Sequence, residues 1–167
     1  MATQTIRELE AKSDAAWKNL TAQLAGMEPY LERADAPGEW TAREVLSHLM
    51  FESDWKPAVL LASFAERDLP VIEISPGDTF LTPERSRMTL PQFVAALEGK
   101  RREAFDYLRG LSEADLTRKA RIPLFKSFMG TDEIPLPMFV GAIYDHHLND
   151  HAGQLAKIRK AVGLPTA

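Results

Sequence analysis

The chain has 167 residues, of which 45% are hydrophobic and 26% charged, and this length and composition predict one globular domain over residues 1–167. It has no cysteine, which excludes disulfides, thiolate metal sites, iron–sulfur clusters and cysteine nucleophiles. The net charge of −4 argues against nucleic acid as a partner, and because no apolar run suits a membrane helix or a secretory leader, we expect a cytoplasmic protein.

Apolar residues at three- and four-residue steps predict helices along most of the chain, and no alternating stretch predicts a sheet. The first helix is expected over residues 6–34, where Leu20, Leu24 and Leu31 lie on one stripe. It is expected to stop before the loop signal at residues 35–38.

The second helix has the sharpest start in the sequence, a capping box formed by Thr41 and Glu44. We expect it to run to about Arg67 with a kink at Pro57, because proline removes one helical hydrogen bond and clashes with the preceding turn. The irregular connection over residues 68–88 is long enough to carry the chain along the whole bundle.

Thr89 caps the third helix, which is expected to end at Gly110. Residues 121–137 contain three prolines and a glycine and are expected to form an extended connection. The fourth helix is expected over residues 138–162. The sequence therefore predicts an all-α fold, a four-helix bundle.

Three histidines lie on core-facing helix stripes. His147 and His151 are one turn apart, so their imidazoles can share one metal ion. His48 shares a face with Val45 and Leu49 and therefore points toward the interior or its rim. Three imidazoles without a thiolate suit a divalent ion such as zinc or nickel and leave coordination positions open for water or substrate. The alternative is that each is a hydrogen-bonded core histidine.

Other polar residues near these stripes are candidates for catalysis. Glu52, one turn beyond His48, could act as a general base or orient an imidazole, unless it is a solvated helix residue. Tyr144, one turn before the histidine pair, could donate to a substrate, although an aromatic at this spacing is more often core. Of the polar residues that flank the histidine pair, Gln154 lies nearest the stripe and is a candidate partner for an imidazole. His146 lies about 100° from His147 around the helix and is not expected to bind metal.

Two segments resemble the signatures of the DinB-like superfamily. Residues 38–49, Gly-Glu-Trp-Thr-Ala-Arg-Glu-Val-Leu-Ser-His-Leu, are similar to its Trp-Ser-x-x-Glu-x-x-x-His-Leu signature. Residues 147–155, His-Leu-Asn-Asp-His-Ala-Gly-Gln-Leu, resemble the His-x-x-x-His-x-x-Gln-Ile motif of its last helix. Residues 89–116 also agree in type and order, so the resemblance spans nearly the whole chain.

The resemblance implies a four-helix bundle with up-down-down-up topology, often a homodimer, that holds a divalent metal through His48, His147 and His151. Relatives include cytosolic transferases and isomerases that use bacillithiol, mycothiol or glutathione. A small-molecule substrate follows from the resemblance, with a low-molecular-weight thiol as one candidate.

Taken together, the residues and the resemblance predict a metal-dependent enzyme, either a thiol-dependent S-transferase or isomerase or a hydrolase. The metal would lower the pKa of a bound water or thiol, and Glu52 or Tyr144 would manage protons. The alternative is a non-catalytic binding or dimerisation module in which the metal ties the second helix to the fourth.

Overall fold

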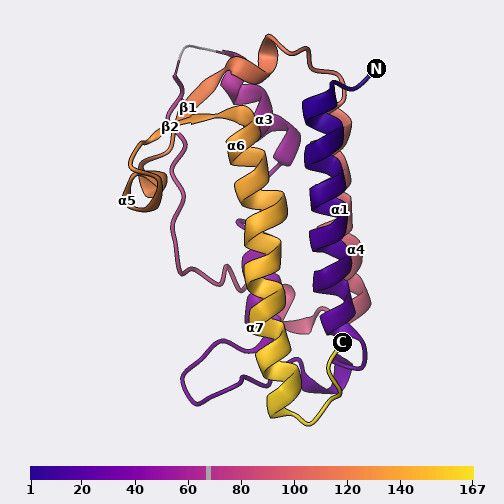
Figure 1. Ribbon diagram of the computed structural model, residues 1–167. Coiled ribbons are helices and arrows are strands. Elements are labelled where there is room, and N and C mark those ends of the chain that lie inside the picture. Colours follow the sequence, from indigo (N-terminus) through magenta and orange to yellow (C-terminus); the bar gives the residue numbers. More distant parts are fainter. Residues whose placement is uncertain (67–68) are drawn as a thin grey trace.

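The computed structural model describes residues 1–66 and 69–167, and its main body is a four-helix bundle (Figure 1). The first and last helical segments run in one direction, whereas the second and third both run in the other, so the topology is up-down-down-up. The connection after the second segment returns along the outside of the bundle. The segments are α1 (Gln4–Leu24), α2 (Ala42–Leu49) with α3 (Pro57–Glu66), α4 (Leu90–Leu108), and α6 (Leu136–Gly141) continued by η5 (Ala142–His146) and α7 (His147–Ala161).

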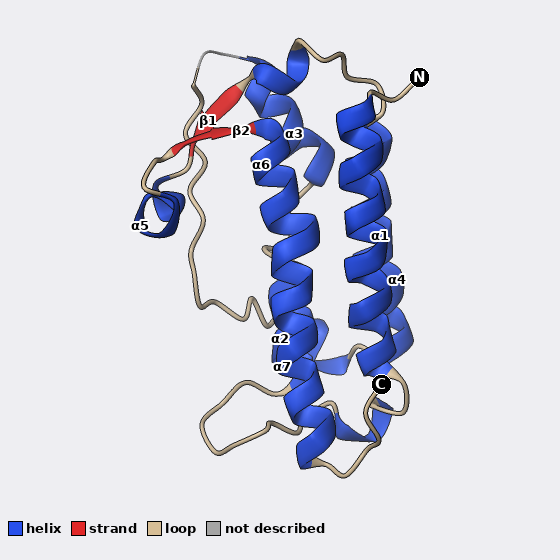
Figure 2. Cartoon of the chain, viewed as in Figure 1, coloured by secondary structure: helices blue, strands red, loops and turns tan. Residues whose placement is uncertain are grey.

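Short elements fill the connections. Strands β1 (Lys119–Arg121) and β2 (Glu133–Pro135) pair antiparallel, with Ala120 opposite Ile134. This two-stranded sheet was not predicted, but it is too small to change the all-α class. Figure 2 shows that the segment between the strands carries α5 to one side of the bundle. The remaining elements are η1 (Glu28–Tyr30), η2 (Arg85–Arg87), η3 (Asp115–Thr117), η4 (Pro123–Phe125) and α5 (Lys126–Met129).

The starts of the second and third helical segments agree with the sequence prediction. The Thr41 Oγ1 accepts from the backbone N–H of Glu44, whose carboxylate accepts from the N–H of Thr41 at 2.8 Å. Thr89 and Gln92 form the same reciprocal pair at the start of α4. Each box satisfies two backbone donors that the helix itself leaves unpaired.

The first helix is shorter than predicted. α1 ends at Leu24, and Gly26 follows with a φ of 76°. Glycine adopts this left-handed conformation without steric cost, and Pro29 cannot continue the helical hydrogen bonding. Leu31 is nevertheless buried, so the stripe identified core residues beyond the end of the helix.

The predicted second helix is in fact two helices. α2 ends at Leu49, and Phe51 turns the chain with a φ of 57°. Pro57 is the first residue of α3 and not a kink, because its restricted φ suits the first helical turn and its missing N–H has no helical partner there. The predicted end at Arg67 and the first residue of the predicted connection, Asp68, lie outside the described residues.

The core consists of two apolar clusters arranged along the bundle. One contains Phe105 and Tyr144, and the other contains Leu148 and Leu155. His147 lies between Tyr144 and Leu148 in the chain, so it stands where the two clusters meet. Among the described residues, no helix combines the length and the apolar character needed to cross a membrane.

Candidate metal centre

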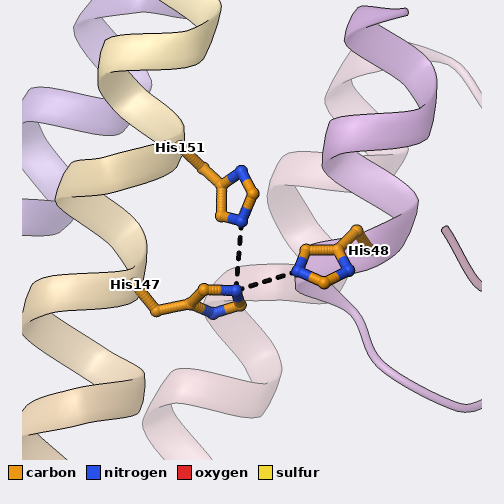
Figure 3. A group of neighbouring side chains, drawn as sticks. All are labelled: His48, His147 and His151. Carbon is orange, nitrogen blue, oxygen red and sulfur yellow. Dashed lines mark hydrogen bonds between the residues drawn. The ribbon is translucent and has the colours of Figure 1, made fainter. Parts of the chain in front are cut away.

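Three imidazoles meet between α2 and α7 (Figure 3). His48 lies in the last turn of α2, and His147 and His151 lie in the first turns of α7. The Nε2 atom of His147 lies 2.9 Å from Nε2 of His48 and 3.1 Å from Nε2 of His151. One ring nitrogen from each residue lies within 4.8 Å of the other two. The structure therefore brings together the three histidines that the sequence placed on core-facing stripes.

Hydrogen bonds at the outer nitrogens orient two of the rings. Nδ1 of His48 lies 2.5 Å from the backbone oxygen of Asp78, and because a carbonyl only accepts, Nδ1 carries the proton and donates. Nδ1 of His151 donates in the same way to Oε1 of Gln154 at 2.8 Å. A neutral imidazole protonated at Nδ1 has its lone pair on Nε2. The lone pairs of His48 and His151 therefore both point toward Nε2 of His147, which lies within hydrogen-bond distance of each. A single proton on Nε2 of His147 can form a good hydrogen bond to only one of them, whereas a divalent ion can bind all three nitrogens, so the donor set fits a metal.

Burial favours the neutral form of these rings. Burial, together with the neighbouring imidazoles of His151 and His48, lowers the pKa of His147 to about 3. Burial also lowers the pKa of His151, although the hydrogen bond to Gln154 acts in the opposite direction. Both rings are therefore neutral at pH 7, which is the form that binds a metal.

Aromatic side chains surround the imidazoles and reduce their contact with water. A site enclosed in this way has a low effective dielectric constant, which strengthens the interaction of a bound cation with its ligands. Trp40 lies within the segment that carries the sequence resemblance, whereas the two phenylalanines were not predicted. The centroid distances are 6.4 Å from Trp40 to His151, 6.0 Å from Phe80 to His48 and 5.6 Å from Phe51 to His147.

The buried Arg85, only 4% exposed, holds both phenylalanines in place. Phe51 and Phe80 have φ values of 57° and 50°, a left-handed conformation that is costly for residues other than glycine. Nη1 of Arg85 lies 2.6 Å from the carbonyl oxygen of Phe51 and 3.0 Å from that of Phe80. It also lies 3.1 Å from the carbonyl oxygen of Ser47. One guanidinium thus ties the end of α2 to the segment that supplies Asp78.

The structure does not bring Glu52 to the imidazoles. The expectation that it lies one helical turn beyond His48 is wrong, because α2 ends at Leu49. The Glu52 side chain is exposed and lines a separate, smaller hollow beside Phe80.

Tyr144 has the placement of a core residue. Its ring packs edge-on against Phe105, with centroids 5.7 Å apart, and burial raises the pKa of its hydroxyl. The hydroxyl has no hydrogen-bond partner among the described residues. Tyr144 contributes to a small hollow behind His147, on the side of Phe51 and Trp55.

The backbone before His147 is a π-helix, Ala142–His146. Such wider turns are frequent at functional sites, and a stripe counted at 3.6 residues per turn gives no sign of them. His146 is exposed and is not part of the imidazole cluster, as predicted from its position around the helix.

A cavity of about 820 Å³ opens beside the three histidines, which form part of its lining. Residues 74–77 of the long connection, α5 and α6 supply other parts of the wall. A volume of this size accommodates a small molecule. A ligand in the cavity would reach the imidazoles directly.

The model of the DinB superfamily matches residues 5–155 of the chain. A search of curated proteins finds no match to the chain. Among solved structures, the chain is similar to YfiT from Bacillus subtilis, described as a probable metal-dependent hydrolase with an unusual four-helix bundle topology. The TM-score is 0.74 at 16% sequence identity, over 99% of this chain and 91% of YfiT. At that identity the similarity shows the fold, and it confirms the predicted four-helix bundle.

Proposed function

The chain belongs to the DinB superfamily, and we propose that it is a divalent-metal-dependent hydrolase of small molecules whose ion is held by His48, His147 and His151. The observation that carries the proposal is the convergence of three Nε2 atoms, two of them with lone pairs directed by hydrogen bonds at Nδ1. Three protein ligands beside a cavity are typical of catalytic zinc sites, whereas structural sites have four. Imidazole ligands suit zinc and nickel.

A divalent ion held there would lower the pKa of a bound water toward neutrality and polarise a substrate carbonyl. The residues of the chain support this chemistry in two ways. The backbone carbonyl of Asp78 and the side chain of Gln154 accept hydrogen bonds from Nδ1 of His48 and His151 and thereby orient these rings. Neither Glu52 nor Tyr144 lines the cavity, so we assign proton transfer to Asp145 and Asp150, which do.

A thiol-dependent transferase or isomerase would use the same three ligands, because a divalent ion stabilises a thiolate as it does a deprotonated water. The two activities differ in the nucleophile and not in the site. The non-catalytic alternative differs from both, because it requires the metal for stability alone.

The test is a substrate screen on untagged protein of known metal content. The panel contains carboxylic esters, amides and lactones, together with bacillithiol, mycothiol and glutathione, each paired with an electrophile. We expect hydrolysis of at least one carbonyl substrate, reduced by at least about 100-fold in His151→Ala. The control Lys157→Ala changes an exposed residue further along α7 and is expected to retain the activity.

Hydrolysis that is unaffected by His151→Ala would contradict the proposal. Turnover with a thiol and an electrophile alone would assign group transfer in place of hydrolysis. No turnover, combined with a large fall in melting temperature on chelation, would favour the non-catalytic module.

A further inference from the structure

The cavity beside the histidines has an apolar wall. Phe128 and Met129 of α5 and Met138 of α6 line it, and they are 65%, 39% and 42% exposed. Exposing large apolar side chains to water costs free energy, although scattered ones need no explanation. Several of them on one concave surface, next to a group of candidate metal ligands, are typical of a ligand-binding site.

This wall is anchored to the core. Phe125, which begins the turn into α5, is buried, and its ring lies 5.2 Å from Phe128 and 6.3 Å from Phe139 of α6. The backbone N–H of Ile122 donates to the carbonyl oxygen of Asp132 at 2.7 Å and closes the segment at the β-hairpin. Figure 2 shows α5 held beside the bundle at this position. The apolar side chains are therefore presented by an ordered element.

The charged groups of the lining do not favour a polyanionic ligand. Besides histidines, they are Lys12, Asp145 and Asp150, which together have one more negative than positive charge, and a divalent ion at the three imidazoles would change this to one net positive charge. A phosphorylated or polyanionic ligand needs an excess of cations or a row of free backbone donors. The π-helix η5, which directly precedes His147, adds the apolar Ala142 and Ile143 to the lining. The lining thus fits a largely apolar molecule that is not polyanionic.

We propose that the substrate is a carbonyl compound with an extended apolar group, which lies against Phe128, Met129 and Met138 while the carbonyl reaches the three imidazoles. The assignment of the reacting end rests on the proposed function. The apolar part rests on the cavity alone, and its volume of about 820 Å³ lies within the range of small-molecule sites.

A homologous series of ligands tests the apolar part without any catalytic turnover. Methyl n-alkyl ketones of five to ten carbons are uncharged, carry a carbonyl and cannot be hydrolysed. Calorimetric titration of the untagged protein, with its metal content measured, is expected to show the Kd falling about fourfold per added methylene until the cavity is filled. A Kd that does not change with chain length would overturn the proposal, and this result needs no variant.

Two variants locate the binding surface. Phe128→Asp and Met138→Asp place a charge on the wall at exposed positions. Each is expected to weaken binding of the longest ketone at least tenfold. The matched control is Val59→Asp on α3, which is 62% exposed and lies outside the lining. Equal weakening in all three variants would overturn the proposal.

His151→Ala separates this proposal from the proposed function. It removes a proposed metal ligand but leaves the apolar wall, so the dependence on chain length is expected to remain when turnover is lost. Turnover that requires His151, combined with binding that ignores chain length, would uphold the metal-dependent reaction and overturn the apolar substrate.

A second copy of the chain is the other occupant that could cover this wall. In that case light scattering would show Phe128→Asp converting a dimer into a monomer, and the wild-type protein would bind all ketones equally weakly. That pair of results would overturn the proposal.

Discussion

At the scale of single residues, the partners of the histidines determine what the cluster can bind. A histidine of this cluster binds a metal only when its Nε2 has a free lone pair. A hydrogen bond donated by Nδ1 keeps the proton on Nδ1 and so leaves Nε2 free. The Nδ1 proton of His48 is held by the backbone carbonyl of Asp78, and that of His151 by the side chain of Gln154. Of these two partners, only the side chain can be tested by substitution.

Gln154→Leu removes the acceptor for His151 Nδ1, and we expect it to weaken metal binding by about 10-fold to 100-fold, because the ring loses its fixed tautomer and orientation. Gln154→Glu keeps an acceptor oxygen at the same distance along the side chain and is expected to bind within a few-fold of wild type. Competition with a chromogenic chelator measures both. Equal losses in the two variants would count against a role for the hydrogen bond.

Burial of His147 makes the stability of the metal-free protein depend on pH. Its pKa is about 3 in the folded state, against about 6.5 in an unfolded chain. Between these values the unfolded state binds a proton that the folded state does not. The free energy of unfolding is therefore highest above pH 6.5 and decreases as the pH falls toward 3, by up to about 1.4 kcal/mol per pH unit.

We therefore expect the urea midpoint of chelator-treated protein to fall between pH 7 and pH 5, with a smaller fall for His147→Ala. The exposed His146 supplies the control, because His146→Ala should keep the wild-type slope. Identical slopes for wild type and His147→Ala would contradict the assignment of this pH dependence to His147.

The sequence identified the site residues that lie on regular helices and missed those on irregular segments. The histidine pair and Gln154 follow from helical spacing alone. Glu52 was misplaced because nothing in the sequence marks Phe51 as a left-handed residue. Asp78 and Arg85 belong to a connection without periodicity, and only the tertiary path of the chain brings them to α2.

At the scale of elements, helix starts were predicted better than helix interruptions. The starts at Thr41 and Thr89 depend on side chains three residues apart, which the sequence displays. The end of α2 lies instead within a network centred on Arg85, and the π-helix before His147 has no counterpart in a spacing of 3.6 residues per turn. The predicted periodicity therefore located the core faces but not every helix boundary.

Arg85→Met tests this network. The substitution leaves the carbonyl oxygens of Ser47, Phe51 and Phe80 without their buried donor, at a cost of about 2–3 kcal/mol or more. We expect a melting temperature lower by about 5–10 °C and weaker metal binding, because His48 and Asp78 lose their support. Arg87→Met, an exposed neighbour in the same short turn, is the control, and a similar effect of both variants would contradict the role of Arg85.

At the scale of the whole molecule, long helices connect the two apolar clusters. α1 supplies Ile6 to one cluster and Leu20 to the other, and the last helical segment supplies Val140 and Leu155 in the same way. We therefore propose that residues 1–167 form one domain, as the length and composition suggest. The predicted homodimer stays a prediction.

A single domain is expected to unfold in one cooperative step. Urea titrations followed by far-ultraviolet circular dichroism and by tryptophan fluorescence should give the same midpoint, because the helices and the tryptophan environments are lost together. Two separate midpoints would show that the clusters unfold independently and would contradict the proposal of one domain.

The most direct test of the central claim is the metal content of untagged protein, measured by mass spectrometry for wild type, His147→Ala and His146→Ala. The exposed His146 is adjacent in the chain and controls for the loss of any one imidazole. We expect about one divalent ion per chain in wild type and His146→Ala, and almost none in His147→Ala. Absence of metal from the wild type after incubation with zinc or nickel, or its retention in His147→Ala, would contradict the claim that these imidazoles form a metal site.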